Sequence, residues 1–205
     1  MLELLEGRML DVMKHMRRAN VDYGKSVAIN VGIPLEEAVR LLEELERLGM
    51  LERTTGSAVK STEAKYKLSE VRKHHTYYRL TREGDHFLRE LERDKVTTVL
   101  KLLRGEERAV KLLRIAERAN VDHALTYAKL SGLSLEETIE ELERLVRVGL
   151  MEEDESKVIK FGERRAKPKR ETRTHHKYYR LSRLGELVTR KMRKEENKAK
   201  SDNRE

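Results

Sequence analysis

Two short stretches of the chain combine histidine, tyrosine and arginine in a pattern suited to binding a polyanion. They read His-His-Thr-Tyr-Tyr-Arg-Leu at residues 74–80 and His-His-Lys-Tyr-Tyr-Arg-Leu at residues 175–181. Alternate side chains of a strand share a face. Those that would share the outer face are His75, Tyr77 and Arg79 in the first copy and His176, Tyr178 and Arg180 in the second. Such a row can contact a phosphate backbone or stack on single-stranded bases, although the outer tyrosine could equally pack beneath a β-hairpin.

The adjacent histidines of each stretch are poorly arranged for binding a metal. Successive side chains of a strand point to opposite faces, so His74 and His75 cannot bind the same ion. The sequence contains no cysteine, and no neighbouring carboxylate completes a ligand set. We therefore expect neither a metal nor a cofactor. Protonation of the histidines near neutral pH would instead strengthen phosphate binding.

Positive charge is concentrated around the two stretches. Residues 53–82 contain eight basic and two acidic residues, and residues 156–183 contain eleven basic and two acidic residues. The whole chain has a net charge of only +8, so the remainder carries −7. We predict that a polyanion binds at these basic segments. The candidate nucleic-acid-binding residues are Lys65, Lys67, Arg72, Lys73, His75, Tyr77, Arg79, Lys160, Arg164, Arg165, Lys167, Lys169, Arg170, Arg173, His176, Tyr178 and Arg180.

The chain contains the same unit twice. Arg-Ala-Asn-Val-Asp occurs at residues 18–22 and again at residues 118–122, and the flanking sequences also correspond. A unit of this size can bury a modest core. We predict two tandem domains that are mainly α-helical with small β-hairpins, an α+β architecture. The predicted divisions are 1–95 for the first domain, 96–193 for the second and 194–205 for a disordered tail.

Composition narrows the class of protein. Charged residues make up 40% of the 205 residues, and cysteine, tryptophan and glutamine are absent, a balance typical of hyperthermophile proteins. No apolar run is long enough to span a bilayer, and the start lacks the basic region of a signal peptide. We therefore expect a soluble, cytoplasmic protein. No phosphate-binding glycine loop, nucleophile elbow or paired-acid motif is present, so we do not expect an enzyme.

Three helices should open each unit. The first is predicted over residues 2–18 by apolar residues at helical spacing. These residues are Leu2, Leu5, Met9, Val12, Met13 and Met16. Asp22 and Asp122 are suited to cap the second helix, which should end at Gly32 or Gly132. We prefer this capping role of the repeated aspartate to a role in metal binding or acid–base catalysis.

The third helix should bury one apolar stripe. The predicted stripe is Leu35, Val39, Leu42, Leu45 and Leu48 in the first copy and Leu135, Ile139, Leu142, Leu145 and Val148 in the second. Ser134 and Glu137 predict a capping box at the start of the second-copy helix. Gly49 and Gly149 should end the two helices.

A long hairpin and a final helix complete each unit. The hairpins are predicted from about Met50 to Leu80 and from about Leu150 to Leu181. A hydroxyl residue follows each hairpin and predicts the N-cap of a final helix, over residues 82–103 in the first copy and 183–194 in the second.

The repeated motifs resemble those of a known group of regulators. Leu-Gly-Met-Leu-Glu at residues 48–52 and Tyr-Tyr-Arg-Leu-Thr-Arg-Glu-Gly at residues 77–84 resemble the end of the third helix and the last strand of MarR-, ArsR- and PadR-type winged-helix proteins. Both copies match. The resemblance implies two tandem winged helix-turn-helix domains. The tandem arrangement is also similar to uncharacterised archaeal proteins made of two winged helices.

The third helices depart from that group in their charge. Residues 35–48 and residues 135–148 each contain five glutamates and two arginines. In the winged-helix regulators this element enters the major groove, where phosphates would repel a glutamate-rich face. We therefore do not transfer the usual role of the recognition helix to this chain.

Two functions are consistent with these patterns. The first is nucleic-acid binding through the two basic hairpins, which are the wings of a winged helix. The protein would then be a transcriptional regulator or chromatin-type factor that contacts mainly the backbone of DNA, and RNA is an alternative target. The second is a protein-interaction or assembly module that binds a basic partner through its acidic third helices. The central helices over residues 82–118 are long enough to mediate homodimerisation. No membrane partner is expected.

Overall fold

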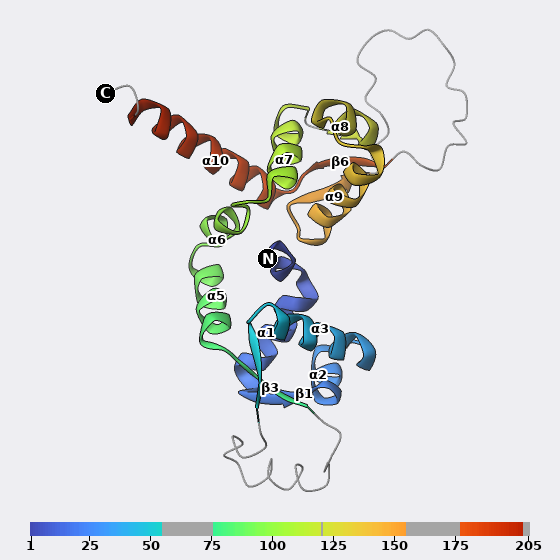
Figure 1. Cartoon of the computed structure of the whole chain (residues 1–205), viewed down its shortest axis with the longest axis vertical. Coiled ribbons are helices and arrows are strands. Elements are labelled where there is room, and N and C mark those ends of the chain that lie inside the picture. The colour runs from blue at the N-terminus through green and yellow to red at the C-terminus, as the bar shows by residue number, and fades with distance from the viewer. Residues whose placement is uncertain (55–75, 120, 155–176, 203–205) are drawn as a thin grey trace, which may run out of the picture. The chain divides into compact units, whose positions relative to one another are not determined.

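In the computed structural model, the chain divides into two compact units, residues 3–98 and 99–205 (Figure 1). The structure describes residues 1–54, 76–119, 121–154 and 177–202. Each unit contains the same succession of elements: a helix, a short strand, two helices, two strands and a closing helix. The chain is thus mainly helical with small antiparallel sheets, as the sequence predicts.

A short 3₁₀ helix, Leu2–Leu5, precedes the regular elements of the first unit. These are α1 (Gly7–Ala19), β1 (Val21–Tyr23), α2 (Gly24–Val31), α3 (Leu35–Arg47), β2 (Leu51–Thr54), β3 (Tyr77–Leu80) and α5 (Arg82–Arg93). Helix α6 (Lys95–Leu102) crosses the boundary between the units. The second unit contains α7 (Glu107–Ala119), β4 (Val121–His123), α8 (Ala124–Ser131), α9 (Leu135–Arg147), β5 (Met151–Asp154), β6 (Tyr178–Leu181) and α10 (Arg183–Asp202).

Each unit has one three-stranded antiparallel sheet. The strand order is β1-β3-β2 in the first unit and β4-β6-β5 in the second. The predicted hairpin strands are present, and each sheet has a third strand that was not predicted. In the first unit this strand pairs Val21 with Arg79 and Tyr23 with Tyr77. A three-residue strand is too short to give a recognisable alternation of apolar and polar residues.

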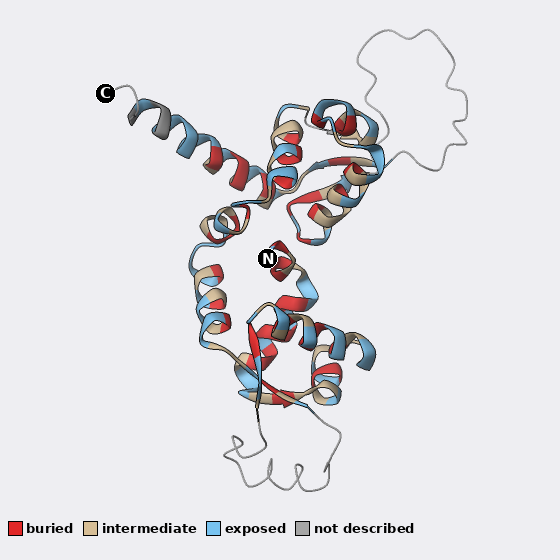
Figure 2. Cartoon of the chain, in the orientation of Figure 1, coloured by how far each residue is buried: buried red, intermediate tan, exposed pale blue. Residues whose placement is uncertain are grey.

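The core of the first unit forms between α1, α3, α5 and the inner face of the sheet (Figure 2). All six apolar residues predicted to lie on the first helix face are buried, although the 3₁₀ turn and α1 share them. The predicted stripe of α3 is partly wrong, because Leu35 and Val39 are 51% and 40% exposed. The buried side of α3 instead carries Ala38, Leu41, Leu42 and Leu45.

Leu35 and Val39 lie against the start of α2. A Cβ atom placed on Gly24 would lie 2.9 Å from Val39 Cγ2 and 3.8 Å from Leu35 Cδ1. Their apolar character therefore serves the contact between two neighbouring helices and leaves much of each side chain in solvent. In the second unit, the predicted stripe fails at the same place, since Leu135 is 44% exposed while Thr138 is buried.

The repeated Arg-Leu-Thr/Ser-Arg-x-Gly motif ties the last strand to the helix after it. Thr81 Oγ1 accepts a hydrogen bond from Gly84 N (3.0 Å) and donates one to the carbonyl of Gly49 (2.7 Å). A Cβ atom on Gly84 would lie only 2.4 Å from the carbonyl oxygen of Met50, so the backbones can approach this closely only at a glycine. Ser182 and Gly185 repeat the arrangement, which confirms the predicted caps.

Two predicted boundaries are corrected. The helix predicted over residues 82–103 is divided at Asp94, which ends α5 and accepts a hydrogen bond from Thr97 N of α6 at 2.9 Å. The tail predicted to be disordered from residue 194 is helical as far as Asp202, because α10 continues through a run rich in lysine, glutamate and alanine. Arg114 of α7 also pairs with Glu196 in this extension.

Candidate nucleic-acid interface

Four of the predicted nucleic-acid-binding residues lie on the hairpin strands β3 and β6, two on each. They are Tyr77, Arg79, Tyr178 and Arg180. The other thirteen lie outside the residues that the structure describes: Lys65, Lys67, Arg72, Lys73, His75, Lys160, Arg164, Arg165, Lys167, Lys169, Arg170, Arg173 and His176. His74 also lies outside the described residues. The prediction that the histidines share a face with the tyrosines therefore concerns residues that the structure does not describe.

The strand arginines are paired with glutamates across each sheet. Arg79 lies opposite Glu52 in the register of β2 and β3, and its Nε is 2.6 Å from the carboxylate. Arg180 lies opposite Glu152, with a corresponding distance of 2.8 Å, and Asp154 is 3.6 Å away. Both arginines remain exposed at the surface. A phosphate would have to compete with these carboxylates, so each arginine offers less free positive charge than its sequence position indicates.

The outer tyrosines pack against the first strand of each sheet. Tyr77 lies opposite Tyr23 in the sheet, with the ring centroids 5.5 Å apart. Burial raises the pKa of the Tyr77 hydroxyl above its ordinary value. In the second unit Tyr178 meets His123 edge to face at 6.0 Å. Each outer sheet face therefore carries an aromatic pair beside an arginine–glutamate pair.

Excess positive charge lies in the two segments that link the hairpin strands. Residues 55–75 contain five basic and two acidic residues, and residues 155–176 contain eight basic and three acidic residues. These two segments therefore carry a net charge of +8, the same as the whole chain. The remaining residues sum to zero. Charge is thus segregated along the chain.

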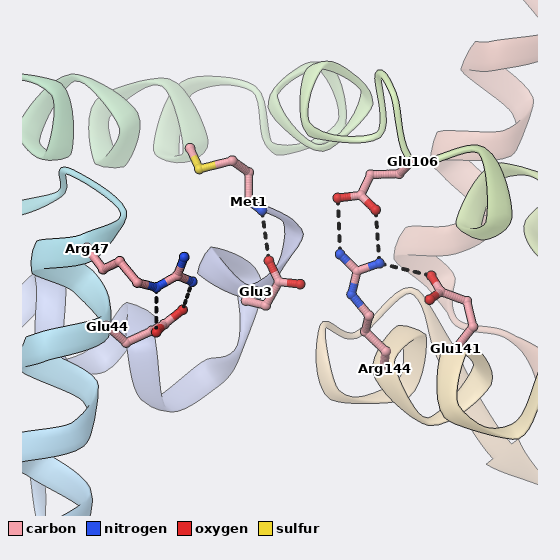
Figure 3. Close-up of polar contacts among 7 residues, drawn as sticks. All are labelled: Met1, Glu3, Glu44, Arg47, Glu106, Glu141 and Arg144. Atoms are coloured by element: carbon pink, nitrogen blue, oxygen red, sulfur yellow. Dashed lines mark hydrogen bonds and ion pairs between the residues drawn. The ribbon is translucent and has the colours of Figure 1, made fainter. Parts of the chain in front are cut away.

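Several glutamates of the third helices are held in ion pairs. Glu37 of α3 pairs with Arg8 of α1, and at the corresponding positions Glu137 of α9 pairs with Arg108 of α7 at 3.0 Å. Figure 3 shows Arg47 on Glu44 within α3, and Arg144 of α9 held by both Glu106 and Glu141. These pairs brace the third helices within their own units and reduce the negative charge that they present.

Other glutamates of the third helices remain unpaired. Across the described ranges, Glu36, Glu43, Glu136 and Glu140 take part in no ion pair. In α3, exposed Leu35 and Val39 lie on the same side as Glu36 and Glu43, and Ile29 of α2 is 72% exposed. These exposed residues, Ile29 of α2 with Leu35, Glu36, Val39 and Glu43 of α3, are called the α2–α3 face below. It combines apolar and acidic side chains.

The repeated aspartate does not act as the predicted cap. Asp22 lies in β1, is 8% exposed and accepts a hydrogen bond from Ser26 Oγ at 2.8 Å. His15 Nε2 lies 2.7 Å from the same carboxylate oxygen. The first residue of α2 is Gly24, so the aspartate is one position too early to cap that helix. It instead satisfies buried polar groups of α1 and α2, which favours a structural role.

Within the part of the chain that is described, no group of three or more histidine, cysteine, aspartate or glutamate side chains could hold a metal ion. In the same part, no helix is both long and apolar enough to cross a membrane.

One candidate site was missed by the sequence analysis. A cleft of about 520 Å³ opens in the second unit between α7, β6 and α10. Arginines from β6 and α10 line it, including Arg180 and Arg190. Its only signal in the sequence is a difference between the two copies, in which small residues replace large ones.

Comparison with known proteins identifies one family. The family model described as "Uncharacterized protein conserved in archaea (DUF2250)" matches residues 3–91 and matches again at residues 100–192. The two matches cover most of the chain and correspond to the two structural units. No curated protein and no solved structure matches the chain.

Proposed function

The chain belongs to this family conserved in archaea, and we propose that it is a nucleic-acid-binding protein with two winged helix-turn-helix units. The order of elements supports the proposal. In each unit a strand precedes two helices joined by a tight turn, and an antiparallel hairpin follows them. The turn is short because Gly32 and Gly132 adopt left-handed conformations, with φ of 75° and 72°.

The segregation of charge is the observation that carries the proposal. In a winged helix, the segment between the two hairpin strands is the wing. Here residues 55–75 and 155–176 occupy that place and together hold the whole net charge of +8. Lysines and arginines in this number would neutralise phosphates and release counterions, which gives strong binding at low salt with little base readout. A transcriptional regulator or chromatin-type factor of DNA is the role that such binding suits best.

The α2–α3 face shapes how binding would occur. Its glutamates would be repelled from the major groove, so the wings would lead and the helices would stay away from the phosphates. Arg79 and Arg180 would contribute only after exchanging a carboxylate for a phosphate, because Glu52 and Glu152 hold them. Binding is therefore expected to be dominated by contacts to the backbone.

The proposal is tested by measuring the affinity of the full chain for a random-sequence DNA duplex at several salt concentrations. We expect log Kd to rise steeply with log salt, as it does for a protein that neutralises about 6–10 phosphates. The triple variant K167E/K169E/R170E should abolish binding. A matched variant with the same change of net charge, K14E/K25E/K111E, alters exposed lysines outside the wings. It should bind the duplex much more tightly than K167E/K169E/R170E does. Equal loss in both variants, or weak binding that salt does not change, would exclude wing-led binding.

The exposed apolar residues of the α2–α3 face favour a second function, the docking of a basic protein. Leu35 and Val39 expose apolar area on the same side of α3 as the unpaired Glu36 and Glu43, and Ile29 of α2 is exposed as well. Apolar contact ringed by acidic groups suits an amphipathic basic segment. This function predicts that I29S/L35S removes partner binding and leaves the affinity for duplex unchanged. Titration with a basic amphipathic peptide, compared between wild type and this variant, tests it.

A further inference from the structure

The second unit contains a cleft at positions where the first unit has larger side chains. Its walls come from the end of α7, the sheet and the first turns of α10, and its volume is about 520 Å³. Ala116 of α7 and Thr189 of α10 line it. The corresponding positions of the first unit hold Met16 and Leu88, which are both fully buried. Two large side chains of the first unit are therefore replaced by two small ones where the cleft lies.

The charges around these positions also differ between the units. In the first unit Arg89 pairs with Asp85, one helical turn before it, at 2.5 Å. The corresponding Arg190 of the second unit lines the cleft, and no carboxylate in the described part of the chain pairs with it. Glu186, which corresponds to Asp85, pairs with Arg183 instead. The cleft therefore has a guanidinium that is free to bind an anion.

Each of the other arginines of the cleft has a carboxylate partner, and Arg180 pairs with Glu152, which also lines the cleft, at 2.8 Å. Arg183 and Glu186 are exposed residues on one helix, an arrangement that contributes little stability. Arg193 lies 3.5 Å from Glu117, a carboxylate that Arg114 also contacts. A ligand anion could engage Arg183 or Arg193 without leaving a buried carboxylate unpaired. Arg190, one or two turns from each along α10, would be the centre of such a site.

We propose that this cleft binds a phosphate-bearing small molecule of about nucleotide size. The planar guanidinium group matches phosphate with two parallel hydrogen bonds and can also stack on a flat ring. Ala116, Leu181 and the arginine stems supply apolar surface for the rest of the ligand. The volume lies within the range of small-molecule sites. The site belongs to the second unit alone, so it does not depend on nucleic-acid binding by the wings.

The test is calorimetric titration of the full chain with AMP and, separately, with inorganic phosphate. We expect AMP to bind wild type. R190Q should weaken binding at least tenfold, whereas R89Q, the matched change in the first unit, should leave it unchanged. Failure of AMP and phosphate to bind at millimolar concentration would overturn the proposal, as would equal losses in R190Q and R89Q.

A second variant tests the shape of the cleft without changing its charge. A116M/T189L introduces the residues of the first unit and should abolish AMP binding. If this variant does not fold, the exposed R190Q decides the question alone. K167E/K169E/R170E should bind AMP as wild type does; loss of AMP binding in that variant would place the phosphate on the wings and overturn the proposal. Weaker duplex binding by R190Q, with AMP affinity unchanged, would assign the cleft to the nucleic-acid backbone and overturn it as well.

Discussion

The guanidinium of Arg17 on α1 lies 2.5 Å from the carboxylate of Glu92 on α5, and the same two helix positions of the second unit carry the opposite charges. There Glu117 of α7 lies 3.5 Å from Arg193 of α10. Both units thus have an ion pair between their first and last helices, although the residue type at each of the two positions differs between the units. The exchange also brings an arginine into the cleft of the second unit, where the first unit has a glutamate.

Exchange of the charges in the first unit should therefore be tolerated. R17E alone places two carboxylates together and should lower the melting temperature, by a small amount because both groups are partly exposed. The double variant R17E/E92R should recover most of that loss. Thermal unfolding at low and high salt measures both effects. If the double variant is less stable than R17E, the pair does not act through its charges alone.

Substitution of the motif glycines should be far more costly. In G84A the new Cβ would lie 2.4 Å from the Met50 carbonyl oxygen, and in G185A it would lie 2.1 Å from that of Leu150. Backbone atoms cannot move aside as a side chain can, so we expect each variant to lose about 1–3 kcal/mol of unfolding free energy or more. G7A is the matched control, because nothing lies within 4 Å of its Cβ position. Urea unfolding of the three variants decides the matter; similar curves for all three would contradict the close approach.

The buried aspartate should matter more in the first unit than in the second. D22A removes the carboxylate that binds the side chains of His15 and Ser26, which should cost about 1–3 kcal/mol. In the second unit Ile115 replaces the histidine, and Asp122 receives a hydrogen bond from His123 N. We expect D122A to cost less than D22A when the unfolding free energies are compared. Equal costs would mean that the contacts of His15 and Ser26 add nothing.

Local features of this fold were well predicted because they depend on neighbours in the chain. The capping box of Ser134 with Glu137, the left-handed turn at Gly32 and the hydroxyl cap at Thr81 each need only a few adjacent residues. The buried side of α3 could not be predicted in the same way. Two apolar stripes share that helix, and the one that meets Gly24 at the start of α2 stays partly in solvent.

The candidate sites depended on features that the sequence does not show directly. The alternation within β3 placed Tyr77 and Arg79 on one face, as predicted, but the pairing of Arg79 with Glu52 follows from the register between strands. The cleft lies where Ala116 and Thr189 stand at the positions that Met16 and Leu88 occupy in the first unit. Neither replacement disturbs the helical pattern, so only the packing reveals the space.

The unpaired glutamates of the third helices give a sharper test of wing-led binding than the paired ones. E36A and E136A remove exposed negative charges that no arginine holds, so both should modestly increase affinity for a random duplex. E37A and E137A are poorer tests, because Glu37 binds Arg8 and Glu137 belongs to the capping box. Their stability should fall while duplex affinity is kept. Loss of duplex binding in E36A would place the third helix in the interface and contradict wing-led binding.

Tyr127 should make the second unit sensitive to alkali. Its side chain is fully buried, its hydroxyl donates a hydrogen bond to the carbonyl of Tyr179 at 3.1 Å, and burial raises its pKa well above the ordinary value of 10.0. Below about pH 10 the hydroxyl is protonated in both the folded and the unfolded states, so its effect on stability does not change with pH. Above pH 10 the unfolded state loses the proton first. Unfolding is then favoured, by up to about 1.4 kcal/mol for each further pH unit.

The Y127F variant tests this reasoning. At pH 8 it should be less stable than wild type by about 0.5–1.5 kcal/mol, because the hydrogen bond is lost. Between pH 10 and pH 11 its stability should fall less steeply, so the two proteins converge. Some decline should remain, because burial also raises the pKa values of Tyr77, Tyr78 and Tyr179. Urea unfolding at several pH values gives both slopes; parallel slopes would show that Tyr127 does not control the alkaline loss of stability.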